Sequence, residues 1–433
     1  MNITNVALEC QEIISIAYTQ ICLALLLRAG LVAVQLGTIP SQNIYKIILY
    51  NILDIAISVA FFGTVGVVFA FGDDKLGVIG FKPWFSLDSI NIYSIVTGFS
   101  SCLIANGIIT TCLAGRMHFF GFVLLNVLLS TILQPMVMHW VWHNSGWMQA
   151  KEFLGIKVSF MDYFGCLVIH IYAGTIALVG GIYLGGRLIL LEEISEMSIG
   201  LESPSNSAMG YIFVIIGFIV FAPPLLSPKA TVVNNLVAFG CGMLSVSGLQ
   251  FLVCKQDVTY WNVLKCIQGA VAAITTVAGG VHLYSPLTTV LLASCGSTAF
   301  YFAQIVLESK SSIEDYSNVV AIHLVCGFLG LVMVPLIIMQ NVTGMVFFLW
   351  HIICIFVTIA VLAVVIVLFL FLLHTAGILR STTDEKNHQR SLVVANKTTH
   401  KKCSQRLFHL NLNAPQIEPG SRKNFKQSIT IDA

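Results

Sequence analysis

Apolar runs long enough to cross a membrane recur along this 433-residue chain and limit what it can fold into. A helix needs roughly 20 apolar residues to span the ~30 Å hydrocarbon core of a bilayer. Eleven such runs lie between polar breaks, the first near 12–36 and the last and longest near 345–375. Only 10% of the residues are charged, against about a quarter in soluble domains. The sequence therefore predicts an all-α polytopic membrane protein with eleven transmembrane helices.

The distribution of charge predicts how the chain is divided. Eleven spans place the two termini on opposite sides of the membrane. From Arg380 to the end, ten lysines and arginines stand against four acids, and cytoplasmic segments carry such an excess of positive charge. We expect residues 1–11 to be an extracellular N-terminus, 12–380 an eleven-helix transport domain, and 381–433 a cytoplasmic basic tail that stays disordered until it binds a partner.

Glycosylation sequons begin at Asn2, Asn341 and Asn396. In this topology the first two lie outside and the third lies inside. The predicted protein is a multi-pass plasma-membrane glycoprotein with its N-terminus extracellular and its C-terminus cytoplasmic.

A spacing of eight residues between an aspartate and a histidine occurs twice, each time with a glycine four residues further on. The two copies are Asp162, His170 and Gly174, and Asp315, His323 and Gly327. The first copy opens the fifth run and the second precedes the tenth, so they enter from opposite faces. Since eight helical residues rise about 12 Å, both histidines reach the middle of the membrane. This predicts a five-plus-five inverted repeat, followed by a long eleventh helix.

Two facing imidazoles can share one proton and offer their remaining nitrogens to a passing molecule. In apolar surroundings this favours a small neutral species over an ion, which would lose its hydration. Metal binding needs a third or fourth ligand, and neither the acids nor the twelve scattered cysteines supply one. We expect no cofactor, no metal and no enzyme activity. Two plainer readings stay open: His170 as a bond between helices, and Asp162 as a helix cap.

The stretch from Asp162 to His170, continuing to Arg187, resembles the signature of the ammonium transporter (Amt/Mep/Rh) superfamily, closest to the Amt branch. Four further motifs are similar to other parts of that family, in the same order. They are Ala29–Gly37 for the first span, His139–Trp142 with Trp147 for the loop before the signature, Gly269–Thr275 for the eighth span and Ile322–Gly327 for the tenth. The likeness covers almost all of the membrane part.

The resemblance implies a homotrimer in the lipid bilayer with one pore in each subunit, and no nucleic-acid partner. It implies transport of ammonium/ammonia through a hydrophobic pore lined by His170 and His323, after ammonium is recruited and deprotonated at an outer vestibule. Asp162 would support the outer ammonium site, Trp147 would hold ammonium by a cation–π contact, and Phe221 would be one of two stacked gate phenylalanines. From spacing alone, an ordinary interfacial tryptophan is an equally good interpretation of Trp147. Without the resemblance, Phe221 is best interpreted as a lipid-facing phenylalanine, one of 28 in the chain.

The chain departs from the family pattern around this pore. Ser101 stands where the second gate phenylalanine is expected, Leu225 replaces a serine that bonds the ion, and Gln35, Gly115 and Asn318 replace acids. Phe99 lies about 200° round the helix from Ser101, so it cannot substitute. The tail lacks the family's regulatory motif. A divergent member is therefore predicted, with a non-conducting ammonium sensor as the alternative function and a metal-dependent membrane enzyme as the least supported one.

Overall fold

The computed structural model describes residues 3–39, 43–84, 90–186, 203–221, 228–254, 260–310, 315, 317–339, 341–383, 385–387 and 389. Its helices and strands are α1 (Ile3–Gly37), α2 (Ile44–Phe61), η2 (Phe62–Gly66), α3 (Val67–Phe71), α4 (Ile92–Leu113), α5 (Phe119–Leu128), η3 (Leu129–Leu133), α6 (Gln134–Trp142), β1 (Lys151–Phe153), β2 (Ile156–Val158), η4 (Cys166–Ile171), α7 (Tyr172–Leu184), α8 (Pro204–Val220), α9 (Pro228–Cys254), α10 (Tyr260–Val277), α11 (Pro286–Lys310), η5 (Val320–Val325), α12 (Cys326–Ile338) and α13 (Asn341–Thr375).

The predicted helical membrane architecture is confirmed. Within the described residues, nine helical segments are long and apolar enough to cross a membrane, and two shorter apolar helices lie at 204–219 and 262–277. Together they occupy the places of the eleven predicted runs, although the count of eleven crossings stays a prediction. The predicted tail falls largely outside the described residues, as do Asn2 and Asn396.

Wider π-helical turns interrupt four of the spans. The segments η2, η3, η4 and η5 each continue directly into an α-helix, so that 44–71, 119–142, 166–184 and 320–338 are continuous helical spans. Pro135 follows η3 at the start of α6, where the missing proline N–H would otherwise break the α-helical ladder. The other two, η4 and η5, carry the two predicted histidines, and such turns are frequent at functional sites.

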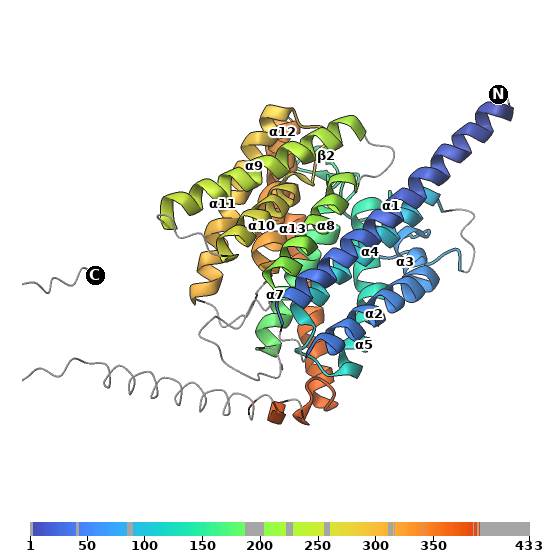
Figure 1. Cartoon of the computed structure of the whole chain (residues 1–433). Coiled ribbons are helices and arrows are strands. Elements are labelled where there is room, and N and C mark those ends of the chain that lie inside the picture. Colours follow the sequence, from blue (N-terminus) through green and yellow to red (C-terminus); the bar gives the residue numbers. More distant parts are fainter. Residues whose placement is uncertain are drawn as a thin grey trace, which may run out of the picture.

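The helices of the two halves of the chain lie side by side (Figure 1), with α1 to α5 on one side, α9 to α12 on the other, and α7 and α8 between them. Glycines allow the halves to approach closely. A Cβ added to Gly30 of α1 would come within 2.6 Å of the Gly210 carbonyl of α8, and one added to Gly210 would come within 2.6 Å of the Gly30 carbonyl. This reciprocal contact between the first helices of each half fits the predicted inverted repeat.

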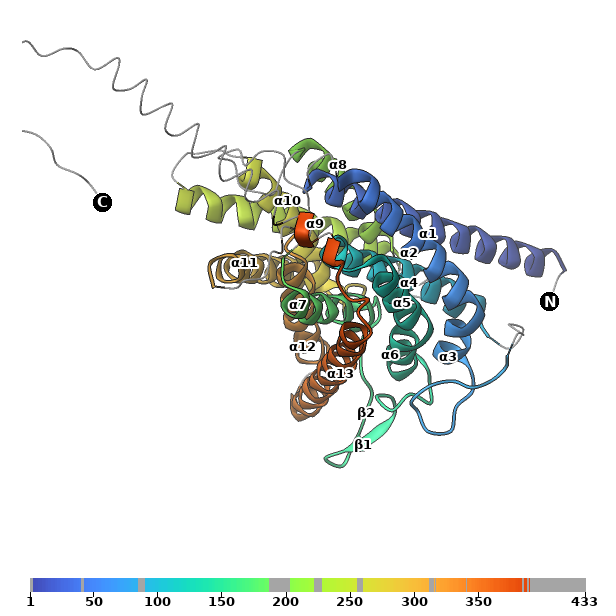
Figure 2. The ribbon, with the colours of Figure 1, turned by 90° about the horizontal axis from the view of Figure 1, so that it is seen from below.

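The last long helix, α13, lies against α7 and α12, and the short antiparallel hairpin of β1 and β2 extends from the same side of the bundle (Figure 2). Large apolar side chains of α9 and α13 are exposed, among them Leu244, Phe251 and Leu368. In a protein without a membrane such surfaces mark an interface. On a bundle of apolar spans they are surface available to lipid or to another subunit.

Candidate functional site

The two predicted histidines lie together in the interior of the bundle. The Nδ1 atoms of His170, in η4, and His323, in η5, are 2.9 Å apart. Their rings are parallel to within 1°, with centroids 5.0 Å apart. The two side chains are only 2% and 5% exposed. Residues that are 153 positions apart in the chain therefore form one hydrogen-bonded pair.

This geometry fixes how the pair can hold protons. A hydrogen bond between two Nδ1 atoms needs one donor and one acceptor, so a single proton lies between the rings. In the neutral pair, the ring that donates through Nδ1 has a free acceptor at Nε2, and the ring that accepts carries its proton at Nε2. The pair thus presents one acceptor and one donor to a small neutral molecule.

An aspartate caps each of the two π-helical turns. The carboxylate of Asp162 accepts hydrogen bonds from the backbone N–H groups of Cys166, Leu167 and Val168, at 2.6, 2.7 and 3.3 Å. In the second copy, Asp315 accepts one from the N–H of Val320, at 2.8 Å. Negative charge is favourable at a helix N-terminus, where the first N–H groups have no helical partner. The capping reading of Asp162 thus has direct structural support.

The chain enters both turns with the same backbone conformation. Gly165 and Asn318, each five residues before its histidine, have φ angles of +80° and +52°. The asparagine at 318 is held in this left-handed conformation while its amide donates to Gln268 at 2.9 Å. Asparagine and glycine are the residues that adopt this region most readily, so the substitution of an acid at 318 is compatible with the turn.

Each glycine of the repeat packs against the other copy. A Cβ on Gly174 would lie 2.6 Å from the backbone nitrogen of Leu324, the neighbour of His323, and one on Gly327 would lie 3.2 Å from Ile171, the neighbour of His170. The absence of side chains at both positions lets the two turns approach until the imidazoles meet.

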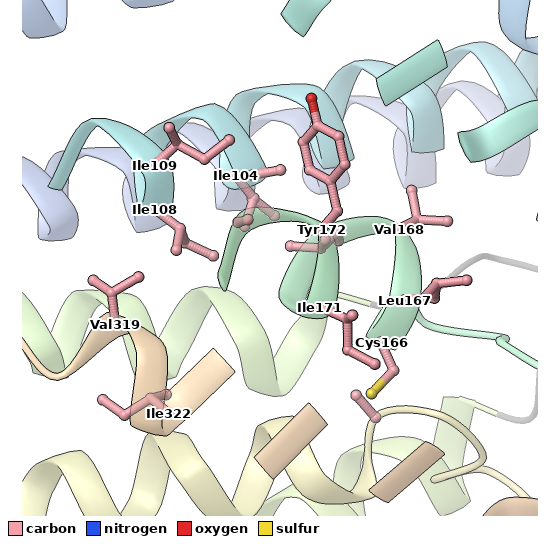
Figure 3. Packing of buried hydrophobic residues seen from close by; sticks show 14 of the residues in the cluster. Ile104, Ile108, Ile109, Cys166, Leu167, Val168, Ile171, Tyr172, Val319 and Ile322 are labelled. Carbon is pink, nitrogen blue, oxygen red and sulfur yellow. The ribbon is translucent and has the colours of Figure 1, made fainter. Parts of the chain in front are cut away.

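The walls around the pair are apolar. Figure 3 shows buried apolar side chains on the two segments that carry the histidines, among them Leu167 and Ile171 of η4 and Ile322 of η5, with Ile104 and Ile108 of α4 near η4. Ions are costly to hold in such surroundings, because nothing replaces their hydration. The surroundings of the pair are therefore suited to a neutral molecule.

A small pocket lies on one side of His170. The space open to the centre of a water-sized sphere is about 10 Å³, which is about what a single water-sized molecule needs. Its walls are three phenylalanines, His170, Asn235 and three aliphatic residues of α10 and the turn that follows it. The phenylalanines are Phe164, Phe218 and Phe221, and the Phe218 ring centroid is 5.1 Å from that of His170.

Of the other predicted site residues, Phe221 lines this pocket and Trp147 does not. Trp147 is partly buried, with its ring 5.7 Å from that of Trp140 and 6.1 Å from that of Trp350. Its backbone N–H donates to the carbonyl of Gly77 at 3.0 Å. The structure therefore places Trp147 in an aromatic cluster at the loops and not at the pocket beside His170.

Ser101, which stands where the resemblance places a second gate phenylalanine, lies in the interior of the bundle. This residue is fully buried, its Oγ has no hydrogen-bond partner in the part of the chain that the structure describes, and its carbonyl accepts from Gln134. Phe99 packs instead on Phe62, with centroids 5.0 Å apart. Leu225 and the prolines before it lie outside the described residues. Gly115, with φ of +81°, ends the turn after α4.

A buried ionic network that the sequence reasoning missed lies in the first half of the bundle. Arg28 of α1 forms an ion pair with Asp54 of α2, and Thr110 of α4 donates to the same carboxylate at 2.9 Å. Asn51 links Arg28 to Gln35. Opposite charges in two neighbouring apolar runs were the available signal, because an ionisable residue inside a membrane span needs a partner.

Within the described part of the chain, no three histidine, cysteine, aspartate or glutamate side chains are grouped so that they could hold a metal ion. The free cysteines there are dispersed, and most of them are buried.

Comparison with known proteins agrees with this architecture. Ammonium transporter 3 of Dictyostelium discoideum is 23% identical over 325 residues, covering 72% of this chain and 73% of that protein. Ammonium transporter Amt2 of Archaeoglobus fulgidus is 23% identical over 327 residues, covering 72% and 68%. These relatives are transporters and not enzymes.

Solved structures share the fold. A sensor Amt protein has a TM-score of 0.74 at 21% sequence identity, covering 86% of this chain and 95% of that one. Mep2 of Saccharomyces cerevisiae has a TM-score of 0.71 at 16% identity, covering 86% and 88%. The profile of the Ammonium Transporter Family matches residues 16–392. The chain therefore belongs to the ammonium transporter family.

Proposed function

We propose that this protein conducts ammonia derived from ammonium through a narrow apolar passage that runs past His170 and His323. The observation that carries the proposal is the pair of buried imidazoles with Nδ1 atoms 2.9 Å apart, beside a pocket of molecular size. Ammonium is recruited at an outer vestibule that includes Trp147 and the region supported by Asp162, and Phe221 gates the entrance from there to the pocket beside His170. It loses its proton there, because a neutral molecule avoids the large cost of an ion in hydrocarbon.

The histidine pair then forms hydrogen bonds with the neutral molecule. Ammonia has one lone pair and three N–H groups, so it can accept from a ring N–H and donate to a bare ring nitrogen. The pair offers both kinds of group at its Nε2 atoms. The three phenylalanines around the pocket exclude bulk water from it.

The same proposal includes a topology and an assembly. We place the protein in the plasma membrane as a homotrimer with its N-terminus outside and its tail inside. Figure 1 supports opposite sides for the two ends, since the N-terminus and the last described turns after α13 lie at opposite ends of the bundle. The excess of lysine and arginine after residue 380 supports the direction.

Uptake measurements test the function. Purified protein in liposomes, or expression in yeast that lacks ammonium transport, is expected to give ammonium-dependent flux or growth. His170→Ala and His323→Ala are expected to change that flux strongly. Flux that is the same in wild type and in both variants would overturn the assignment of the histidines to the passage.

A second function, an ammonium sensor without conduction, is favoured by one observation. Ser101 leaves the buried position of a gate ring without an aromatic side chain. In addition, one structure with this fold is described as a sensor Amt protein. Ammonium binding without flux in the same liposomes would decide for the sensor.

A further inference from the structure

The pocket beside His170 has one polar side chain besides the histidine. Asn235 lies in α9, is 3% exposed, and lines the pocket with aromatic and aliphatic residues. A buried amide in such a wall needs hydrogen-bond partners, because leaving a buried polar group unpaired is unfavourable.

Only one half of the Asn235 amide is engaged within the described part of the chain. Its Nδ2 donates to the carbonyl of Ile219, in the last turn of α8, at 3.1 Å. A carbonyl partner requires the NH₂ group on that side, so the orientation of the amide is fixed by the bond. The Oδ1 atom has no partner among the described residues, and it is an acceptor with two lone pairs.

The neighbouring residue shows what a purely structural asparagine does here. Asn234 donates to the carbonyls of Val281 and Tyr284, at 2.7 and 2.8 Å, and so fixes the turn after α10. It does not line the pocket. Asn235 differs, because it makes one such bond, lines the pocket, and has an Oδ1 acceptor without a partner among the described residues.

We propose that Asn235 Oδ1 is a ligand-binding acceptor, which holds an N–H group of the molecule that occupies the pocket next to His170. The ligand class is a small nitrogen donor, ammonium or ammonia, with at least two N–H groups. One N–H bonds Asn235 Oδ1, and a second reaches the Nε2 acceptor of His170 when that ring donates its Nδ1 proton to His323. This assignment rests on the proposed function and adds a residue that selects for N–H donors.

Two near-isosteric variants separate this role from a structural one. Asn235→Leu and Asn235→Asp both lose the donor to Ile219, but only the aspartate variant keeps an oxygen at the pocket. Since a hydrogen bond contributes about 0.5–1.5 kcal/mol with a neutral donor and about 1.5–3 kcal/mol with a charged one, Asn235→Leu is expected to raise the ammonium concentration for half-maximal flux about ten-fold. Asn235→Asp is expected to require a lower ammonium concentration for half-maximal flux than Asn235→Leu, because it keeps an acceptor oxygen.

The experiment has two readouts in the full-length protein. Flux is measured in liposomes, and binding is measured as the rise in melting temperature with ammonium chloride relative to sodium chloride. Leu236→Ala, on a half-exposed face of the same helix, is the control and is expected to match wild type in both. The proposal is supported when Asn235→Leu loses the ammonium-specific rise and Asn235→Asp retains it.

Other outcomes are informative about different claims. Equal losses in Asn235→Leu and Asn235→Asp, or no loss in either, overturn the acceptor role of Asn235 and leave conduction past the histidines intact. Binding that depends on Asn235 without flux in wild type supports the acceptor and contradicts conduction. Absence of an ammonium-specific rise in wild type overturns the pocket as an ammonium site.

Discussion

Arg28 and Asp54 form an ion pair in which the side chains are 1% and 0% exposed, so two full charges lie within the membrane-spanning bundle. The pair joins α1 to α2. The Arg28 guanidinium also packs against α4, where a Cβ on Gly107 would come within 2.2 Å of its Nη1 atom. Two of its nitrogens, Nε and Nη1, have no partner among the described residues. The network lies apart from the residues that line the pocket beside His170.

Replacing only one member of this ion pair is expected to destabilise the folded protein. Arg28→Met or Asp54→Asn leaves a buried charge without its partner, and each is expected to lower the free energy of unfolding by about 3–5 kcal/mol. The double variant Arg28→Met/Asp54→Leu removes both charges and should lose less than either single variant. Thermal unfolding of detergent-solubilised protein measures the three variants. Melting temperatures of the single variants equal to that of wild type would contradict this account.

The two glycines of the repeat should differ in their tolerance of a methyl group. Gly174→Ala places a Cβ 2.6 Å from backbone of η5, whereas Gly327→Ala meets an isoleucine side chain at 3.2 Å. Backbone cannot yield as a side chain can, so Gly174→Ala is expected to destabilise by about 1–3 kcal/mol and Gly327→Ala by less. Gly240→Ala in α9, with no neighbour within 4 Å, is the control and should be neutral or stabilising. Similar effects at 174 and 327 would argue against the tight contact.

A histidine beyond the end of α6 predicts a dependence on pH. Burial lowers the pKa of His143, while Asp73 and Asp74 act in the opposite direction. Its ring stacks on that of His139, with centroids 4.4 Å apart, and its Nδ1 contacts the hydroxyl of Ser145 at 2.7 Å. The folded protein thus favours the neutral ring.

The sign follows from proton binding. As the pH falls below the ordinary histidine pKa of about 6.5, the unfolded chain takes up the proton at His143 before the folded protein does, so stability falls towards the lower folded pKa. Above that range the contribution is constant. Melting temperatures from pH 7.5 to 5.5 should fall less steeply in His143→Asn than in wild type. Parallel curves for the two proteins would show that this histidine contributes nothing to the slope.

The sequence predicted much of the histidine site because the relevant signals are local and repeated. The eight-residue interval from Asp162 to His170 recurs from Asp315 to His323, and each interval ends in a π-helical turn. The helical rise expected over all eight residues is wrong, because η4 begins only at Cys166 and η5 only at Val320. Symmetry then places the two rings opposite each other. The caps by Asp162 and Asp315 follow from the same local rules, since a carboxylate suits the first turn of a helix.

Contacts between distant helices could not be predicted in this way. The partner of Arg28 depends on how α1 and α2 pack, and the apolar runs that contain them give no preferred face when nearly every residue is hydrophobic. The same holds for Asn235, because the partners of its NH₂ group and its carbonyl oxygen are known only once α8 and α9 are placed. The position of Trp147 among other tryptophans depends on the loop between α6 and η4, whose conformation has no periodic signal.

The hydrogen bond between His170 and His323 has a consequence for successive events. The hydrogen between the two Nδ1 atoms can be bound to either ring, so the pair has two tautomeric states. When the protonated Nε2 of one ring gives up its proton and the bare Nε2 of the other ring receives one, the shared hydrogen moves to the first ring and the two tautomers are exchanged. In the proposed passage, a pair whose tautomers have been exchanged offers its donor and its acceptor in exchanged places to the next ammonia molecule.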